Sequence, residues 1–147
     1  MSDPKPRSPF RGIDHLGIAV ADLAEAVRAL RDDLGFPVIA QEEVAEQKVR
    51  VVKLDAGGTD LELLESTDPE GPIGKFLCAR GPGIHHVSLR VDDLEKTLAS
   101  LAARGVRLID RTPRLGAEGK RIAFIHPKAT AGVLIELCET GPPPEVS

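Results

Sequence analysis

Tryptophan and tyrosine are absent from this 147-residue chain, which has only four phenylalanines and two cysteines. Cys78 and Cys138 lie far apart and outside any CxxC pattern. The sequence therefore excludes a disulfide framework and a zinc knuckle, and it favours two reduced, partly buried thiols. No run approaches the roughly 18 apolar residues of a membrane span. The proline-rich start lacks the apolar segment of a signal peptide, so we expect a cytoplasmic protein without a membrane partner.

A basic excess is lacking as well. The formal net charge is -4, and lysine and arginine are spread along the chain. Because a phosphate-binding surface usually needs clustered positive charge, we expect no nucleic-acid partner. Hydrophobic residues make up 41% and charged residues 29% of the chain, a balance typical of globular proteins. The length suits one ordinary domain or two half-size units that share one core.

What the sequence does contain is an internal repeat. Residues 13–23, IDHLGIAVADL, match residues 84–94, IHHVSLRVDDL, at a shift of 71 positions that aligns His15 with His86. Each copy is followed by a stretch in which leucine and alanine recur at three- and four-residue steps, as in an amphipathic helix. The residues expected to cap and to end these two helices are Asp22 and Gly35 in the first copy, and Asp93 and Gly105 in the second.

Three strand-like runs follow each predicted helix, so each half reads as a β-α-β-β-β unit. The runs are residues 36–43, 47–55 and 59–66 in the first half and 106–113, 120–127 and 131–139 in the second. Glycine-rich turns separate them. The expected organisation is a flexible arm at 1–11, a first module at 12–66, a connector at 67–83 with a short helical turn at 73–79, a second module at 84–139 and a flexible tail at 140–147.

The alternation of side chains across a strand sorts the repeated segment into two faces. His15 shares a face with two small residues, and His86 lies on the matching face of its own strand. This small and polar face is what a cavity needs. Asp14 begins the opposite, apolar face of Leu16, Ile18 and Val20. His85 aligns with Asp14, so we expect it to point away from the metal and to have a structural role.

The last strand of each half carries one carboxylate among hydrophobic residues. These carboxylates are Glu62 and Glu136, 74 positions apart. An unpaired buried charge costs several kcal/mol, and a bound cation removes that cost. A pseudo-twofold arrangement of the halves would bring both carboxylates together with His15 and His86. Two imidazoles and two carboxylates form a set suited to Co, Mn, Ni, Zn or Fe(II). The sequence does not assign a role to His126, in the HPK turn.

Six motifs follow one another between residues 12 and 139: IDHLGIAV, EQKVRV, ELLE, GPIGKF, GIHHVSLRV, and HPK followed by GVLIEL. Their order resembles that of the vicinal oxygen chelate superfamily and, within it, of the methylmalonyl-CoA epimerases. It implies an α+β fold in which two tandem βαβββ modules form a half-open curled sheet around a metal, with the helices outside. It also implies a homodimer, an acyl-CoA substrate and a divalent metal, preferentially Co(II), with Zn, Mn and Ni as alternatives.

The resemblance assigns roles by position. His15, His86 and Glu136 match the metal ligands, and Glu62 falls at a fourth ligand position that is glutamine in some members. The implied reaction interconverts (2R)- and (2S)-methylmalonyl-CoA by α-proton abstraction and reprotonation through a metal-stabilised enolate. Such a reaction needs a base on one face of the substrate and an acid on the other. Glu136 matches a proposed base of the family.

The chain departs from the family pattern at Val51, where some members have a second catalytic glutamate. The second proton carrier therefore stays open. The candidates are Glu62, Glu43, Gln47 acting through a water molecule, and a residue of the HPK turn. The residues that hold the coenzyme A tail stay open as well, with Lys128, Arg121 and Arg90 as candidates.

Three other functions are compatible with the same scaffold. A glyoxalase-type lyase uses a similar histidine and glutamate set, but the HPK and GVLIEL motifs and the scarcity of aromatic residues argue against it. Ring-cleaving dioxygenases use three protein ligands and normally need a longer chain. A metal-free binding protein of the resistance type often lacks some ligands, whereas this chain keeps all four.

Overall fold

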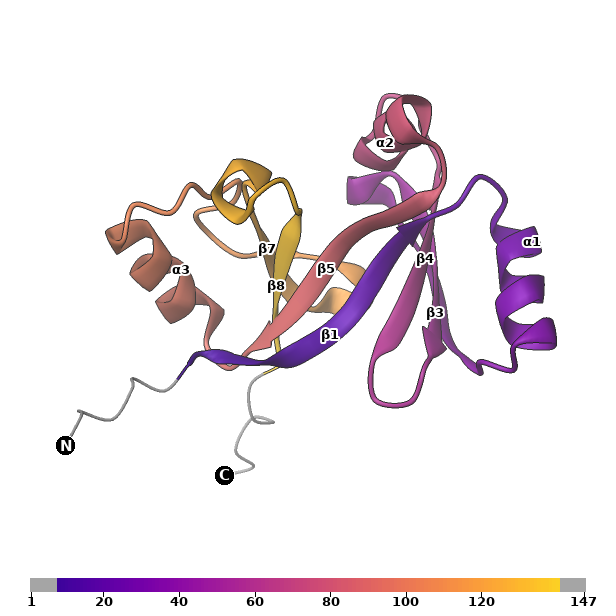
Figure 1. Ribbon diagram of the computed structural model, residues 1–147, viewed down its shortest axis with the longest axis horizontal. Coiled ribbons are helices and arrows are strands. Elements are labelled where there is room, and N and C mark those ends of the chain that lie inside the picture. Colours follow the sequence, from indigo (N-terminus) through magenta and orange to yellow (C-terminus); the bar gives the residue numbers. More distant parts are fainter. Residues whose placement is uncertain (1–7, 141–147) are drawn as a thin grey trace.

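The computed structural model describes residues 8–140, in which one curved eight-stranded sheet carries, on its outer side, the helix that follows the first strand of each half (Figure 1). Most of the expected N-terminal arm and C-terminal tail lie outside the described residues. The first half comprises β1 (Phe10–Ala19), α1 (Leu23–Val27), the π-helical η1 (Arg28–Asp33), β2 (Val38–Val44), the 3-10 turn η2 (Ala45–Gln47), β3 (Val49–Asp55) and β4 (Asp60–Ser66), and α2 (Pro72–Arg80) follows it. The second half comprises β5 (Gly83–Val91), α3 (Leu94–Ala103), β6 (Arg114–Leu115), η3 (Ala117–Gly119), β7 (Arg121–Ile125), η4 (Pro127–Thr130) and β8 (Ile135–Glu139).

The strand order, β2-β3-β4-β1-β5-β8-β7-β6, is the same in both halves when read outward from the centre. The central strands β1 and β5 pair antiparallel. Each then pairs in parallel with the last strand of its own half, β1 with β4 and β5 with β8. The predicted α+β fold of two curled β-α-β-β-β units is therefore confirmed, and the two histidine-bearing strands lie side by side.

The predicted helix ends are confirmed. The Asp22 carboxylate accepts a hydrogen bond from the backbone N–H of Glu25 at 3.0 Å, and Asp93 accepts one from Lys96 at 3.0 Å. Such capping satisfies backbone donors that the first helical turn leaves free. After each helix the chain reverses at a glycine with positive φ, 85° at Gly35 and 79° at Gly105. The helical turn expected in the connector is α2.

The strand expected at residues 106–113 is wrong. Leu108 alone forms a bridge, to Ile125, and regular pairing resumes only in the two-residue β6. The backbone N–H groups of Ile109 and Asp110 both donate to the carbonyl of Phe124, and the Asp110 carboxylate accepts from the Phe124 N–H at 2.8 Å. A side chain thus takes the place of a backbone ladder bond, so this segment bends instead of extending the sheet.

Two clusters of the hydrophobic core lie between the helices α1 and α3 and the convex side of the sheet. In the second half, Leu94 and Leu98 of α3 pack with Val91, Ala123 and Leu137 of the sheet. In the first half, α1 and η1 cover a matching cluster around Leu54 and Leu63. Because α1 and α3 cover the convex side, the concave side of the sheet is left for a cavity, which α2 borders with Pro72 and Ile73. Within the described residues, no helix combines the length and apolarity needed to cross a membrane.

Candidate active site and metal centre

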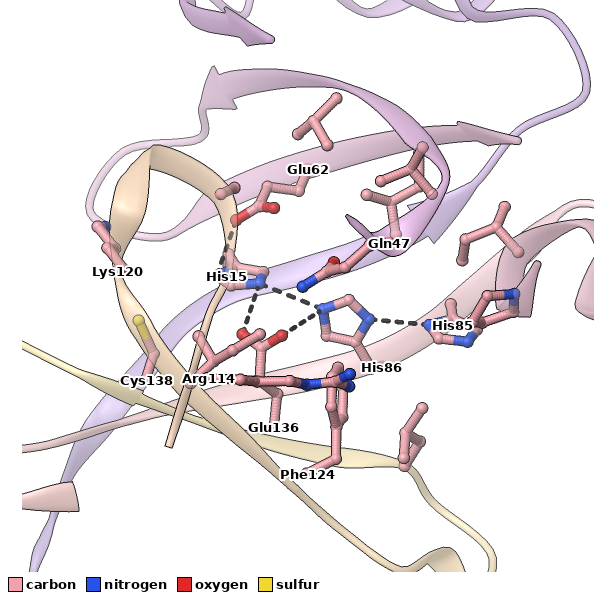
Figure 2. A pocket seen from close by; sticks show the side chains of 18 of the residues that line it. His15, Gln47, Glu62, His85, His86, Arg114, Lys120, Phe124, Glu136 and Cys138 are labelled. Carbon is pink, nitrogen blue, oxygen red and sulfur yellow. Dashed lines mark hydrogen bonds and ion pairs between the residues drawn. The ribbon is translucent and has the colours of Figure 1, made fainter. Parts of the chain in front are cut away.

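The concave side of the sheet encloses a cavity of about 260 Å³ that both halves line (Figure 2). All four predicted ligands line it: His15 on β1, Glu62 on β4, His86 on β5 and Glu136 on β8. Each of the four residues is only 4–5% exposed. The interpretation that the polar face of each repeat borders a cavity agrees with this arrangement.

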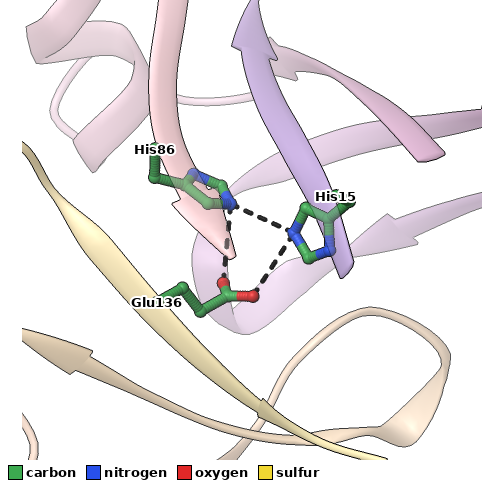
Figure 3. A group of neighbouring side chains, drawn as sticks. All are labelled: His15, His86 and Glu136. Atoms are coloured by element: carbon green, nitrogen blue, oxygen red, sulfur yellow. Dashed lines mark hydrogen bonds and ion pairs between the residues drawn. The ribbon is translucent and has the colours of Figure 1, made fainter. Parts of the chain in front are cut away.

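Three of the four side chains converge (Figure 3). The Nε2 atoms of His15 and His86 are 3.2 Å apart. The Glu136 carboxylate lies against both, with Oε1 3.3 Å from Nε2 of His15 and Oε2 3.6 Å from Nε2 of His86. Two imidazole nitrogens and a carboxylate that face one another in a buried space fit a divalent transition metal well. The donor set present thus fits the cation that the resemblance implies.

Glu62 approaches His15 from the other side of the imidazole ring. Its Oε2 lies 3.1 Å from Nδ1 of His15, whereas the convergent group uses Nε2. It forms a second buried group with His15 and Asp14. The structure therefore brings His15, His86 and Glu136 to one point and places Glu62 beside that point.

Two residues differ from the strand alternation that the sequence suggested. Asp14 and His85 are each the extra residue where the pairing of β1 with β5 shifts register, between Ile13 and His15 and between Ile84 and His86. A bulge of this kind re-aims the side chain of the extra residue. Asp14 is buried beside the site, and His85 lines the cavity. The prediction that Asp14 belongs to the apolar face is therefore wrong. His85 lines the cavity but is not part of the convergent group, and its structural role stays a prediction.

Each bulge residue contacts the histidine that follows it. Asp14 Oδ2 accepts a hydrogen bond from His15 Nδ1 at 2.7 Å, and Nδ1 of His85 lies 2.9 Å from Nδ1 of His86. Both contacts engage Nδ1, so both rings present Nε2 to the convergent group. Partners of this kind orient a metal-binding histidine and select its tautomer. The repeat therefore duplicates the supports of the two histidines as well as the histidines themselves.

Gly17 and Ser88 occupy equivalent positions in the repeat and support the site in different ways. Gly17 lies opposite His86 in the β1–β5 pair and leaves room for its ring. Ser88 Oγ donates a hydrogen bond to Glu136 Oε1 at 2.8 Å and is fully buried. The hydroxyl fixes the carboxylate of the second half, and Glu62 has no such donor because its neighbour on β1 is Gly17.

We expect Gly17→Ala to weaken metal binding by about 10- to 100-fold, as loss of a ligand's support does. A methyl group at position 17 would lie 2.1 Å from Cε1 of His86, so the ring has to leave its place. Calorimetric titration with Co(II) measures the change. Gly83→Ala is the matched control, since a Cβ there meets nothing within 4 Å. Unchanged Co(II) affinity in Gly17→Ala would show that His86 does not bind the metal from this position.

Burial and neighbouring groups shift the pKa values of the two histidines in opposite directions. Burial alone would lower the pKa of His15, but hydrogen bonds to Asp14 and Glu136 raise it to about 10. Burial lowers the pKa of His86 to about 4, which keeps its ring neutral and its lone pair free. Burial raises the pKa of Glu62 to about 7. For Glu136, burial is outweighed by the hydrogen bond from His15, which lowers its pKa.

A buried lysine beside the site was not predicted as a functional residue. Lys53 on β3 is 3% exposed and faces Glu62 in the strand pair, with Nζ 4.0 Å from Glu62 Oε2. It forms an ion pair with Glu118 of the second half, which raises its pKa against the effect of burial. The alternation Val49, Val51, Lys53 on one face of β3 was the available signal. This ion pair links the two halves beside the cavity.

The candidates for binding the coenzyme A tail lie outside the cavity lining. Arg121 is paired with Glu95 and Glu139, Arg90 donates to Asp14 and to a backbone carbonyl, and Lys128 is exposed on η4. The cations that do line the cavity are Arg114 and Lys120. Their signal in the sequence was weak, because both follow the segment that was misread as a strand.

Among the candidates for a second proton carrier, Glu62 and Gln47 line the cavity. Glu43 is exposed and forms an ion pair with Arg50, and no residue of the HPK turn lines the cavity. His126 instead accepts a hydrogen bond from the backbone N–H of Lys128 and caps η4. Cys78 is exposed, whereas Cys138 is buried and lines the cavity.

Comparison with known proteins agrees with this architecture. The model of the Glyoxalase/Bleomycin resistance protein/Dioxygenase superfamily matches residues 14–124. Uncharacterized protein YqjC of Bacillus subtilis is 45% identical over 127 residues, which are 86% of this chain and 91% of that protein. The mitochondrial methylmalonyl-CoA epimerase of Dictyostelium discoideum is 38% identical over 129 residues, which are 86% of this chain and 77% of the epimerase.

Solved structures show the same similarity. The methylmalonyl-CoA epimerase from Mycobacterium tuberculosis superimposes with a TM-score of 0.88 at 41% identity and covers 93% of each chain. A methylmalonyl-CoA epimerase in complex with methylmalonyl-CoA and NH4+ gives a TM-score of 0.85 at 38% identity, over 90% of this chain and 99% of that one.

Proposed function

This chain belongs to the Glyoxalase/Bleomycin resistance protein/Dioxygenase superfamily, and we propose that it interconverts (2R)- and (2S)-methylmalonyl-CoA. The observation that carries the proposal is the buried group of His15, His86 and Glu136 inside a cavity, in a chain whose fold matches two methylmalonyl-CoA epimerase structures over 90% and 93% of its residues. A proton-transfer reaction suits this site, because a carboxylate stands at the same point as a cation-binding histidine pair. The proposed substrate is an acyl-CoA thioester.

The proposed cofactor is one divalent cation, Co(II) by resemblance, held by His15, His86 and Glu136 with Glu62 as the fourth ligand. When bound, such a cation acts as a Lewis acid that polarises the thioester carbonyl and acidifies the neighbouring C–H group. Asp14 and His85 orient the two imidazoles through their Nδ1 atoms. The hydrogen bond from Ser88 holds Glu136 in place for both ligation and proton transfer.

The proton steps are assigned to carboxylates on opposite walls of the cavity. Glu136, from the second half, takes the α-proton of one epimer. Glu46 and Glu62 of the first half also line the cavity, but Glu46 is exposed, whereas Glu62 is buried beside His15, and we propose Glu62 as the second proton carrier. An acid and a base that approach one carbon from two sides are what inversion at that carbon requires.

Exchange with solvent tests the function directly. In deuterated buffer, metal-loaded protein is expected to incorporate deuterium at C2 of methylmalonyl-CoA well above the rate in buffer alone, because the abstracted proton mixes with solvent. Mass spectrometry of the recovered thioester measures the uptake. Protein stripped with a chelator serves as the control. If the loaded protein adds no deuterium beyond the buffer rate, it is not an epimerase.

The lyase and the metal-free binding protein have separate tests. A glyoxalase-type lyase would isomerise a glutathione hemithioacetal, and we expect no such turnover. A metal-free binding protein would purify without metal and resist loading with Co(II), whereas we expect binding of Co(II). The homodimer implied by the resemblance and the cytoplasmic location expected from the sequence stay predictions, and sedimentation of the purified chain tests the first of them.

A further inference from the structure

Gln47 presents an unpartnered hydrogen-bond donor at the site. Within residues 8–140, its Nε2 is the one buried side-chain nitrogen or oxygen that lacks a hydrogen-bond partner. The residue lines the cavity, and its side chain extends toward His15 and His86 (Figure 2). Buried polar groups are nearly always paired, so an unpaired amide directed into a cavity indicates a ligand that completes it.

The local backbone holds this side chain in place. Gln47 ends the 3-10 turn η2, and Lys48 follows with a left-handed φ of 57° that sends the chain directly into β3. Lys48 is anchored to the segment after β4, because its carbonyl accepts from the N–H of Thr67 at 3.0 Å and its Nζ lies 3.2 Å from Asp68 Oδ2. The position of the amide is therefore set by the fold and does not depend on a loose loop.

The surroundings of the amide define what it can bind. The strand that follows contributes Val49 and Val51 to the cavity lining, and both pack with Ile73. An amide N–H group needs a hydrogen-bond acceptor, and these apolar side chains offer none, so the acceptor has to come from a bound ligand. Because the side chain extends toward the candidate metal ligands, that acceptor is an oxygen beside the reacting carbon.

We propose that the Gln47 amide donates a hydrogen bond to the thioester oxygen of the bound acyl-CoA and stabilises the negative charge that grows there as the α-proton leaves. The inference rests on the proposed function. It assigns the first half a donor for the developing oxyanion, while Glu136 of the second half removes the proton. Donors aimed at developing charge in a water-poor site contribute strongly to catalysis. The assignment also explains why Gln47 need not carry a proton itself.

Gln47→Leu tests the proposal in the metal-loaded protein. We expect kcat for epimerisation to fall about 10- to 100-fold, the effect of losing a hydrogen bond to a charged oxygen, while the Co(II) content stays unchanged. Gln41→Leu is the matched control, because Gln41 is exposed on β2 and lies outside the cavity lining. Unchanged kcat in Gln47→Leu overturns the proposal. Loss of Co(II) also overturns it, since the amide would then act as a metal ligand.

Two further measurements keep the outcome decisive. Gln47→Glu has the same size but no donor at the ionised carboxylate, so it is expected to lose kcat as well and decides the matter if the leucine variant does not fold. The Kd of malonyl-CoA, measured by calorimetry, separates this inference from the proposed function. If the wild type adds no deuterium to methylmalonyl-CoA but Gln47→Leu still weakens malonyl-CoA binding, the epimerase proposal fails and the donor assignment stands. If the wild type adds no deuterium and Gln47→Leu binds malonyl-CoA with the same Kd as the wild type, both the epimerase proposal and the donor assignment fail.

Discussion

Glu136→Gln is expected to lower kcat for epimerisation by between about 10²- and 10⁴-fold, the range for loss of a positioned general base. Glutamine has nearly the shape of glutamate, and its carbonyl can still accept the hydrogen bond from Ser88 and contact a cation. Its amide cannot accept the α-proton. Metal content should therefore fall less than turnover. Circular dichroism follows the epimerisation of the thioester and gives turnover. Metal analysis of the same samples gives the metal content.

A carboxylate outside the site serves as the control for this substitution. Glu70→Gln makes the same chemical change at an exposed residue of the connector and is expected to keep the wild-type rate. A full rate in Glu136→Gln would remove this residue as the base, whatever its contribution to metal binding. Complete loss of metal would limit its assignment to that of a ligand.

His86→Ala is expected to abolish metal binding and epimerisation together. The substitution removes one of the two imidazoles of the convergent group. In the wild type, Nε2 of His86 lies 3.2 Å from Nε2 of His15 and 3.6 Å from Oε2 of Glu136. A cation then keeps one imidazole and loses most of its chelation. The measurements are Co(II) stoichiometry after gel filtration and deuterium exchange at C2. We expect both to drop to the background of chelator-treated wild-type protein.

A second histidine controls for the loss of an imidazole as such. His126→Ala removes a ring that caps η4 and lies outside the cavity lining, so Co(II) stoichiometry and exchange should persist. Far-ultraviolet circular dichroism verifies that both variants fold. Stoichiometric Co(II) in a folded His86→Ala protein would contradict the proposed metal centre.

The site was accessible from the sequence because it is repeated. A single histidine or glutamate in a strand carries little information, but His15 and His86 recur in equivalent positions, and so do the carboxylates of the two final strands. Side-chain alternation then sufficed to place all four on the cavity face. The helix caps at Asp22 and Asp93 followed in the same way, because a cap depends on residues within one helical turn.

Other parts depended on neighbours that are distant in sequence. Residues 106–113 have the composition of a strand, but the Asp110 carboxylate accepts the hydrogen bond of the Phe124 N–H group, and the backbone ladder ends there. The pairing of Lys53 with Glu118 joins two halves, and no local pattern encodes it. The unpartnered amide of Gln47 became visible only once the atoms around it were placed.

The sequence by itself determined the duplicated β-α-β-β-β plan, the caps of its helices and the four residues that carry the proposed chemistry, because each follows from local periodicity repeated twice. Tertiary structure alone decided how those residues face one another. The bulges at Asp14 and His85 arise from the register between β1 and β5, and they turn two side chains toward the histidines that strict alternation would have turned away. Register is a property of two strands together, so neither strand's sequence contains it.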